Sequence, residues 1–119
     1  SFFSKLGTVI EINNEKLSKN FWVTSSMMAP FYELLKVLSD WLVKRGVKRN
    51  EAQKYISSLF IALSIDSSLN SKKDLKHLVK SSQTPRGLNE YTLKYLRKAG
   101  FYRHFSKSLN SILKRLNNV

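Results

Sequence analysis

The chain has 119 residues, 42% of them hydrophobic and 12% aromatic, which is typical of a folded protein and allows one modest domain with a single core. It contains no cysteine, which excludes a disulfide framework and a thiolate metal site. No apolar run approaches the ~20 residues of a membrane-spanning helix. We therefore expect a cytoplasmic protein without membrane contact. Because it begins at Ser1 and not at Met, we also expect a fragment whose N-terminal part is missing.

The net charge of +13 is concentrated in the second half of the chain. Residues 72–119 contain twelve Lys and Arg against Asp74 and Glu90, which leaves +10 there and +3 in the rest. Such a basic half is typical of proteins that bind nucleic acid or another polyanion. However, the basic residues of the last two predicted helices lie between apolar positions, as solvated residues of amphipathic helices do, and no stacking pattern of aromatic residues accompanies them. They are Lys94, Arg97, Lys98, Arg103, Lys107, Lys114 and Arg115. We favour solvated helix faces, with a nucleic-acid-binding module as the alternative.

The N-terminal segment carries a strand signal. Residues 2–6 predict the end of a helix, with Gly7 as its stop, and residues 8–12 alternate β-branched with other residues and predict a strand. The backbone groups of a lone strand need a neighbouring strand, so a sheet is expected upstream. Residues 15–20 are predicted as a polar connection.

From about Ser25 onward the pattern predicts helices throughout. In the first helix, which ends at Gly46, apolar residues recur at three- and four-residue steps, and Pro30 lies in its first turns, where proline is tolerated. The stripe consists of Met27, Met28, Phe31, Leu34, Leu35, Leu38, Trp41 and Leu42. This helix is long for so small a domain. Its large apolar residues are therefore candidates for a subunit interface or for an ordinary monomer core.

Four further helices follow. The second is predicted from Asn50 as N-cap, and the third, a short helix, from the capping box Ser71-x-x-Asp74. The fourth and fifth are predicted over residues 88–99 and 102–117.

The most informative stretch is Thr84-Pro85-Arg86-Gly87-Leu88-Asn89-Glu90, followed by Lys98-Ala99-Gly100-Phe101. A Thr-Pro-x-Gly turn that opens into a helix leaves free backbone N–H groups, and such a terminus can hold a carboxylate or phosphate. These elements resemble the C-terminal domain of pyrroline-5-carboxylate reductase. That family has Ser-Pro-Gly-Gly-x-Thr at the turn and Gly-Gly-Phe or Ala-Gly-Phe about a dozen residues later.

Other landmarks resemble the family in the same order. Ser4-Lys5-Leu6-Gly7-Thr8-Val9-Ile10-Glu11-Ile12 is similar to its last nucleotide-domain helix and strand. The segment from Phe21 to Tyr32 falls where the family has Ser-Gly-Ser-Gly-Pro-Ala-Tyr, and Gly46-Val47-Lys48-Arg49-Asn50-Glu51-Ala52 resembles its Gly-Leu-Pro-x-x-x-Ala link.

The resemblance implies an all-α, five-helix dimerisation domain of the 6-phosphogluconate-dehydrogenase-C-terminal-like type. Residues 1–21 would then be the tail of a Rossmann domain, and residues 22–119 the helical dimerisation and substrate domain. It also implies a homodimer or higher oligomer, in which the long helix and the last two helices pack across the two-fold. The implied reaction is an NADP- or NAD-dependent reduction of a small anionic imine, in proline biosynthesis or a related step. The chain has no Gly-rich dinucleotide turn, so we expect the cofactor to be bound mainly by the absent domain and this fragment alone to be inactive.

The resemblance also places the site. The substrate-binding residues are then Thr84, Arg86, Gly87, Leu88 and Asn89, with the amides of the last three on the carboxylate and Asn89, which replaces the family Thr, as the candidate catalytic residue. Arg86 replaces the first Gly of the turn, where it could pair with an anionic substrate or block the pocket. Plain helix capping is the alternative for the whole turn.

The cofactor-facing motif departs further from the family. It becomes Ser25-Ser26-Met27-Met28-Ala29-Pro30, in which both glycines are replaced. In the family this segment lies beside the nicotinamide, so two methionines would crowd or reshape the site. A catalytically inactive dimerisation domain is therefore a further alternative. His77 and His104 are isolated from carboxylates at ligand spacing, and no metal site is expected.

Overall fold

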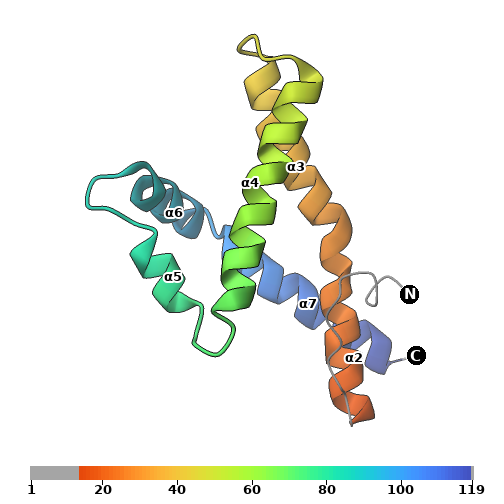
Figure 1. Cartoon of the computed structure of the whole chain (residues 1–119). Helices are drawn as coiled ribbons and strands as arrows, with labels where there is room; N and C mark the ends of the chain where they lie inside the picture. The colour runs from red at the N-terminus through yellow and green to blue at the C-terminus, as the bar shows by residue number, and fades with distance from the viewer. Residues whose placement is uncertain (1–13, 119) are drawn as a thin grey trace.

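The computed structural model describes residues 14–118, and every regular element in that range is helical (Figure 1). The elements are α2 (Glu15–Thr24), the 3-10 turn η1 (Ser25–Met27), α3 (Met28–Val43), α4 (Arg49–Leu69), α5 (Lys76–Ser81), α6 (Leu88–Lys98) and α7 (Phe101–Asn117). The all-α fold is confirmed. The helix end and strand predicted before residue 13 lie outside the described residues. No helix between residues 14 and 118 combines the length and the apolar character that crossing a membrane requires.

The segment from α2 to α3 runs as one rod with a 3-10 turn in its middle. The backbone stays in the right-handed helical region at Thr24, Ser25, Met27 and Met28, so the chain keeps its direction through η1. The polar connection predicted over residues 15–20 is wrong, because these residues form the first part of α2. Asn14 caps this helix, and its side chain accepts a hydrogen bond from the Lys16 amide at 2.9 Å.

Helices α3 and α4 form an antiparallel hairpin. Helix α3 ends at Val43, and Gly46, the predicted stop, follows in the turn with a φ of 103° that suits a residue without a side chain. The prediction of Asn50 as N-cap is wrong by two residues, because α4 begins at Arg49 after Lys48. Small residues allow the two helices to approach closely: Ser39 is 1% exposed and Ala52 is fully buried.

The second half of the chain folds into three shorter helices. Helix α5 begins at Lys76 with Leu75 as its N-cap, so the capping box predicted from Ser71 is wrong. The Asp74 carboxylate accepts from the Lys76 amide at 2.9 Å just before this helix. Helices α6 and α7 are joined through Gly100 with φ of 80°. Helix α7 contacts α6 near its first residues and α2 near its C-terminal end (Figure 1).

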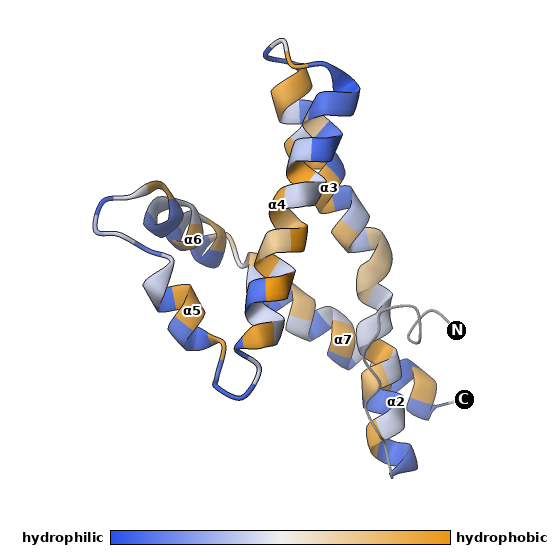
Figure 2. Ribbon diagram, viewed as in Figure 1, coloured by the Kyte–Doolittle hydropathy of each residue, from blue (hydrophilic) through white to orange (hydrophobic). Residues whose placement is uncertain are grey.

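The chain encloses very little core. Among the described residues, the buried ones are Val23, Ser39, Ala52, Ile56 and Gly100. The radius of gyration is 17.0 Å, against about 13.5 Å for a compact domain of this length. The accessible surface is 10659 Å², against about 6,600 Å² for a compact monomer of this mass. Figure 2 shows hydrophobic residues interspersed along α4, and Leu59, Ile61, Leu63 and Ile65 of its second half are exposed. A single copy therefore leaves much apolar surface in water.

Candidate functional site

The turn between α5 and α6 keeps the shape that its sequence predicts. The Gly87 amide donates to the carbonyl of Thr84 at 2.8 Å, which closes a four-residue turn. Arg86 has φ of 63°, and it is the one non-glycine with positive φ among the described residues. Turns with positive φ at the third position favour Gly or Asn there, because a side chain costs free energy in this conformation. Arg86 thus occupies a backbone geometry suited to glycine.

Gly87 is required by close packing within the turn. A Cβ at this position would lie 2.2 Å from the Thr84 hydroxyl oxygen and 2.9 Å from the Thr84 carbonyl oxygen. The hydroxyl therefore folds over Gly87, beside the start of α6. The Gly87 amide donates to the Thr84 carbonyl within the turn, so it is not free to bind a carboxylate as the sequence led us to expect.

The start of α6 carries unpaired backbone donors. The first bond of the helix runs from the Tyr91 amide to the Gly87 carbonyl at 3.2 Å, and no side chain caps this end. The amides of Leu88, Asn89 and Glu90 consequently have no acceptor within the described chain. The helix dipole places partial positive charge there, which favours a carboxylate or phosphate. Leu88 can bind an anion only through its amide, because its side chain has no polar group, and the residue is 88% exposed.

Asn89 also lines a cavity of about 200 Å³ between α5, α6 and α7. Thr92, Leu93 and Tyr102 contribute to its wall, together with Ser82 and Gln83. The last two bond to the carbonyls of Leu78 and Val79, at 2.6 and 2.8 Å, which fixes them to the end of α5. The other polar side chains of the cavity wall, those of Asn89, Thr92 and Tyr102, make no such bond in the described chain and are available to a ligand.

The predicted cofactor-facing residues, Ser25 to Pro30, form η1 and the first turn of α3. The Ser25 hydroxyl donates to the Trp22 carbonyl at 2.5 Å, so it stabilises the junction between α2 and η1. Ser26, Met27 and Pro30 line an apolar cavity of about 290 Å³, whereas Met28 and Ala29 are exposed. The opposite wall comes from α7, namely Phe101, His104, Phe105, Ser108 and Leu109. The sequence pattern placed apolar residues of α7 inward but did not indicate that they face this segment.

The two predicted halves of the site lie apart within one chain. Figure 1 shows the α5–α6 turn at one edge of the molecule and η1 on the other side of α4. The cavities beside them share no residue. One copy of the chain therefore does not bring the substrate turn to the cofactor-facing segment.

The comparison with protein families agrees with this architecture. The family described as pyrroline-5-carboxylate reductase dimerisation matches residues 15–119. The chain belongs to this family. No match was found among curated proteins or among solved structures. The match to the dimerisation family begins at the first residue of α2, so it includes the helical segment that the sequence pattern missed.

Proposed function

We propose that this chain is the C-terminal domain of an NAD(P)H-dependent reductase that acts on a small cyclic imine bearing a carboxylate. In this proposal it supplies the dimer interface and the turn that holds the substrate. The main support is the turn at residues 84–87, which keeps a glycine-type backbone and opens into a helix with three unpaired amides. By the resemblance of its residues, it corresponds in this proposal to the carboxylate-binding turn of the reductase family.

The proposed roles follow from the geometry of the turn. The amides of Leu88, Asn89 and Glu90 donate to the carboxylate, and the Thr84 hydroxyl lies beside them over Gly87. Arg86 is exposed and positively charged, so it lies free to pair with the same anion. Asn89 lines the cavity beside α6 and is the candidate group beside the imine nitrogen. The nicotinamide, from NADP or NAD, is held by a separate nucleotide-binding domain.

A second protomer completes the site in this proposal. Since the turn and η1 lie on different sides of α4, the substrate turn of one protomer meets the cofactor-facing segment of its partner. Helix α4 supports such an assembly, because apolar residues of its second half point in several directions. They include Leu59, Ile61, Leu63 and Ile65, all exposed in one copy. A helix of this kind is buried on more than one side, which the partner provides.

Kinetics of the full-length protein test the turn. Thr84→Ala is expected to raise the KM for pyrroline-5-carboxylate by roughly 10-fold with kcat little changed, as the loss of one charge-assisted hydrogen bond predicts. Ser106→Ala, an exposed hydroxyl on α7, is the matched control. Arg86→Gly separates the two roles of Arg86: better use of the substrate means that Arg86 blocks the pocket, and weaker binding means that it is a ligand. If neither substitution changes KM, the turn does not bind substrate.

The alternative of an inactive dimerisation domain is supported by the cofactor-facing segment. The glycines of the family are absent there, and Met27 extends into the apolar cavity. NAD(P)H-dependent turnover of any cyclic imine by the full-length protein rules this alternative out.

A further inference from the structure

A row of cations occupies the polar side of α7. Arg103, Lys107 and Lys114 recur at steps of four and seven residues, which places them on one line along the helix, with Asn110 between them. The line is about 16 Å long at 1.5 Å per residue. All three side chains belong to exposed residues, and α7 contains no Asp or Glu.

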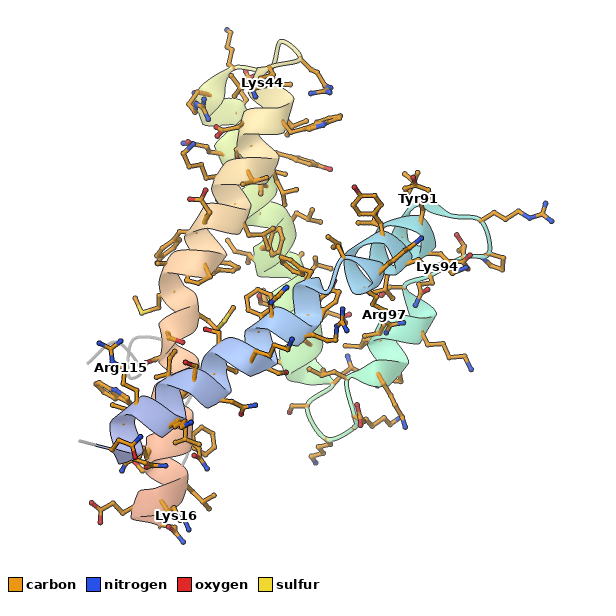
Figure 3. All side chains as sticks on the ribbon, turned by 180° about the vertical axis from the view of Figure 1, so that it is seen from behind. Lys16, Lys44, Tyr91, Lys94, Arg97 and Arg115 are labelled. Atoms are coloured by element: carbon orange, nitrogen blue, oxygen red, sulfur yellow. The ribbon has the colours of Figure 1, made fainter. Side chains whose placement is uncertain are left out.

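Helix α6 carries exposed cations of its own. It carries Lys94, Arg97 and Lys98, which are likewise exposed, and Figure 3 shows Lys94 and Arg97 as labelled side chains of this helix. Only Lys94 has a carboxylate partner among the described residues, Glu90 at 3.3 Å. We define these six cations as the basic face: Lys94, Arg97, Lys98, Arg103, Lys107 and Lys114.

The basic face is separate from the surfaces already described. The apolar residues of α7 that line the cavity near η1, among them Phe101, Phe105 and Leu109, lie on the opposite side of the helix from the cation row. Interface cores between protein subunits are depleted of charged residues, so a surface with five unpaired cations does not suit the dimer contact. It remains open to another partner.

We propose that the basic face binds the phosphate backbone of nucleic acid without reading its sequence. A straight row of cations matches a regular chain of phosphates, and neutralising phosphates supplies affinity by counterion release. The α7 part of the face offers polar Asn110 and small Ser106 beside the cations, with no large apolar side chain to enter a bilayer. This composition favours a nucleic acid over an anionic membrane. The proposal is independent of the reductase function.

Fluorescence anisotropy with labelled oligonucleotides of about 20 nucleotides, single-stranded and duplex, tests the proposal between about 50 and 200 mM salt. The chain is expected to bind at low salt and to lose affinity steeply as salt rises. The triple variant Arg103→Gln, Lys107→Gln, Lys114→Gln is expected to bind at least about 10-fold more weakly, with a log–log salt slope shallower by about 2 to 3.

A matched variant controls for net charge. Lys44→Gln, Lys48→Gln, Lys54→Gln removes the same three charges from exposed positions of the α3–α4 hairpin and is expected to bind like the unaltered chain. Circular dichroism checks that both variants keep their helices. Equal losses of oligonucleotide affinity in the two variants would overturn the proposal that the basic face is the binding surface. Negligible oligonucleotide binding by the unaltered chain at low salt would overturn it as well. Binding to vesicles of phosphatidylserine, without binding to oligonucleotides, would overturn the choice of nucleic acid.

Discussion

Arg86 holds a backbone conformation in which an L-residue other than glycine is strained. A residue with a Cβ loses about 1–2 kcal/mol of folded-state stability in the left-handed region, and glycine does not. Glycine also has more conformational entropy in the unfolded chain, which offsets part of this gain. We therefore expect Arg86→Gly to raise the free energy of unfolding by up to about 1 kcal/mol, and Arg86→Val to lower it. Urea denaturation measures both. Gly87→Ala serves as the opposite control, because its Cβ would collide with Thr84. A loss of stability in Arg86→Gly would contradict the turn geometry.

Asp40 ties the two helices of the hairpin together. Hydrogen bonds from Lys36, at 2.6 Å, and from Arg49 hold the pKa of this carboxyl below its ordinary value, and the same contact raises the pKa of Lys36. Because the folded pKa of Asp40 is lowered, its contribution to stability is present above about pH 4 and is lost as the pH falls through the folded value.

The pH dependence follows from that pair. We expect Asp40→Asn to lower the thermal midpoint at pH 7, and the difference from the unaltered chain to shrink when both are measured below about pH 3. Thermal unfolding followed by circular dichroism at the two pH values gives the comparison. Asp66→Asn is the control, since Asp66 forms no ion pair in the described chain. A difference that stays constant with pH would show that Asp40 acts through something other than its charge.

At the scale of elements, the α3–α4 hairpin depends on small residues at its crossing. Ala52 is fully buried, so Ala52→Leu must either force the helices apart or take an unfavourable rotamer. We expect this substitution to lower the free energy of unfolding by about 1–3 kcal/mol. The neighbouring Gln53→Leu puts the same side chain at an exposed position of α4 and should change stability far less. Equal effects of the two variants would refute close packing at Ala52.

At the scale of the molecule, the excess surface predicts a dimer. The accessible area of one chain exceeds that of a compact monomer by about 4,000 Å², which is more than the roughly 1,000–2,500 Å² that each partner of a permanent interface ordinarily contributes. We expect sedimentation equilibrium at micromolar concentration to show twice the chain mass of 13.8 kDa. The double variant Ile61→Glu, Leu63→Glu should shift the protein toward monomer, whereas Lys54→Glu, on the same helix, should not. A folded monomer of the unaltered chain would refute the interface.

The sequence predicted the elements that local chemistry determines. Glycines at positions 46 and 100 end helices because they adopt positive φ, and the spacing of apolar residues located α3, α6 and α7. Helix α2 was missed because its first residues are polar, and its start depends on the side chain of Asn14. The Asp40 pair was missed because it joins residues nine positions apart across a turn.

The candidate site was predictable only in part. The turn at Thr84 and Gly87 follows from its residue types, but nothing in the pattern shows that Arg86 adopts the glycine conformation. Nor does the pattern show that α7 faces Met27, because an amphipathic helix does not specify which neighbour covers it.

The shortage of buried residues in one copy also governs how this protein unfolds. With five buried residues among those described, one of them a glycine, a single chain has little to offset the entropy lost on folding, so we expect folding and association to be one reaction. The midpoint of heat or urea denaturation then depends on the protein concentration and is not a fixed property of the chain. It should rise each time the protein concentration is raised tenfold, and at sufficient dilution the helices themselves should melt at a temperature where the concentrated protein is intact.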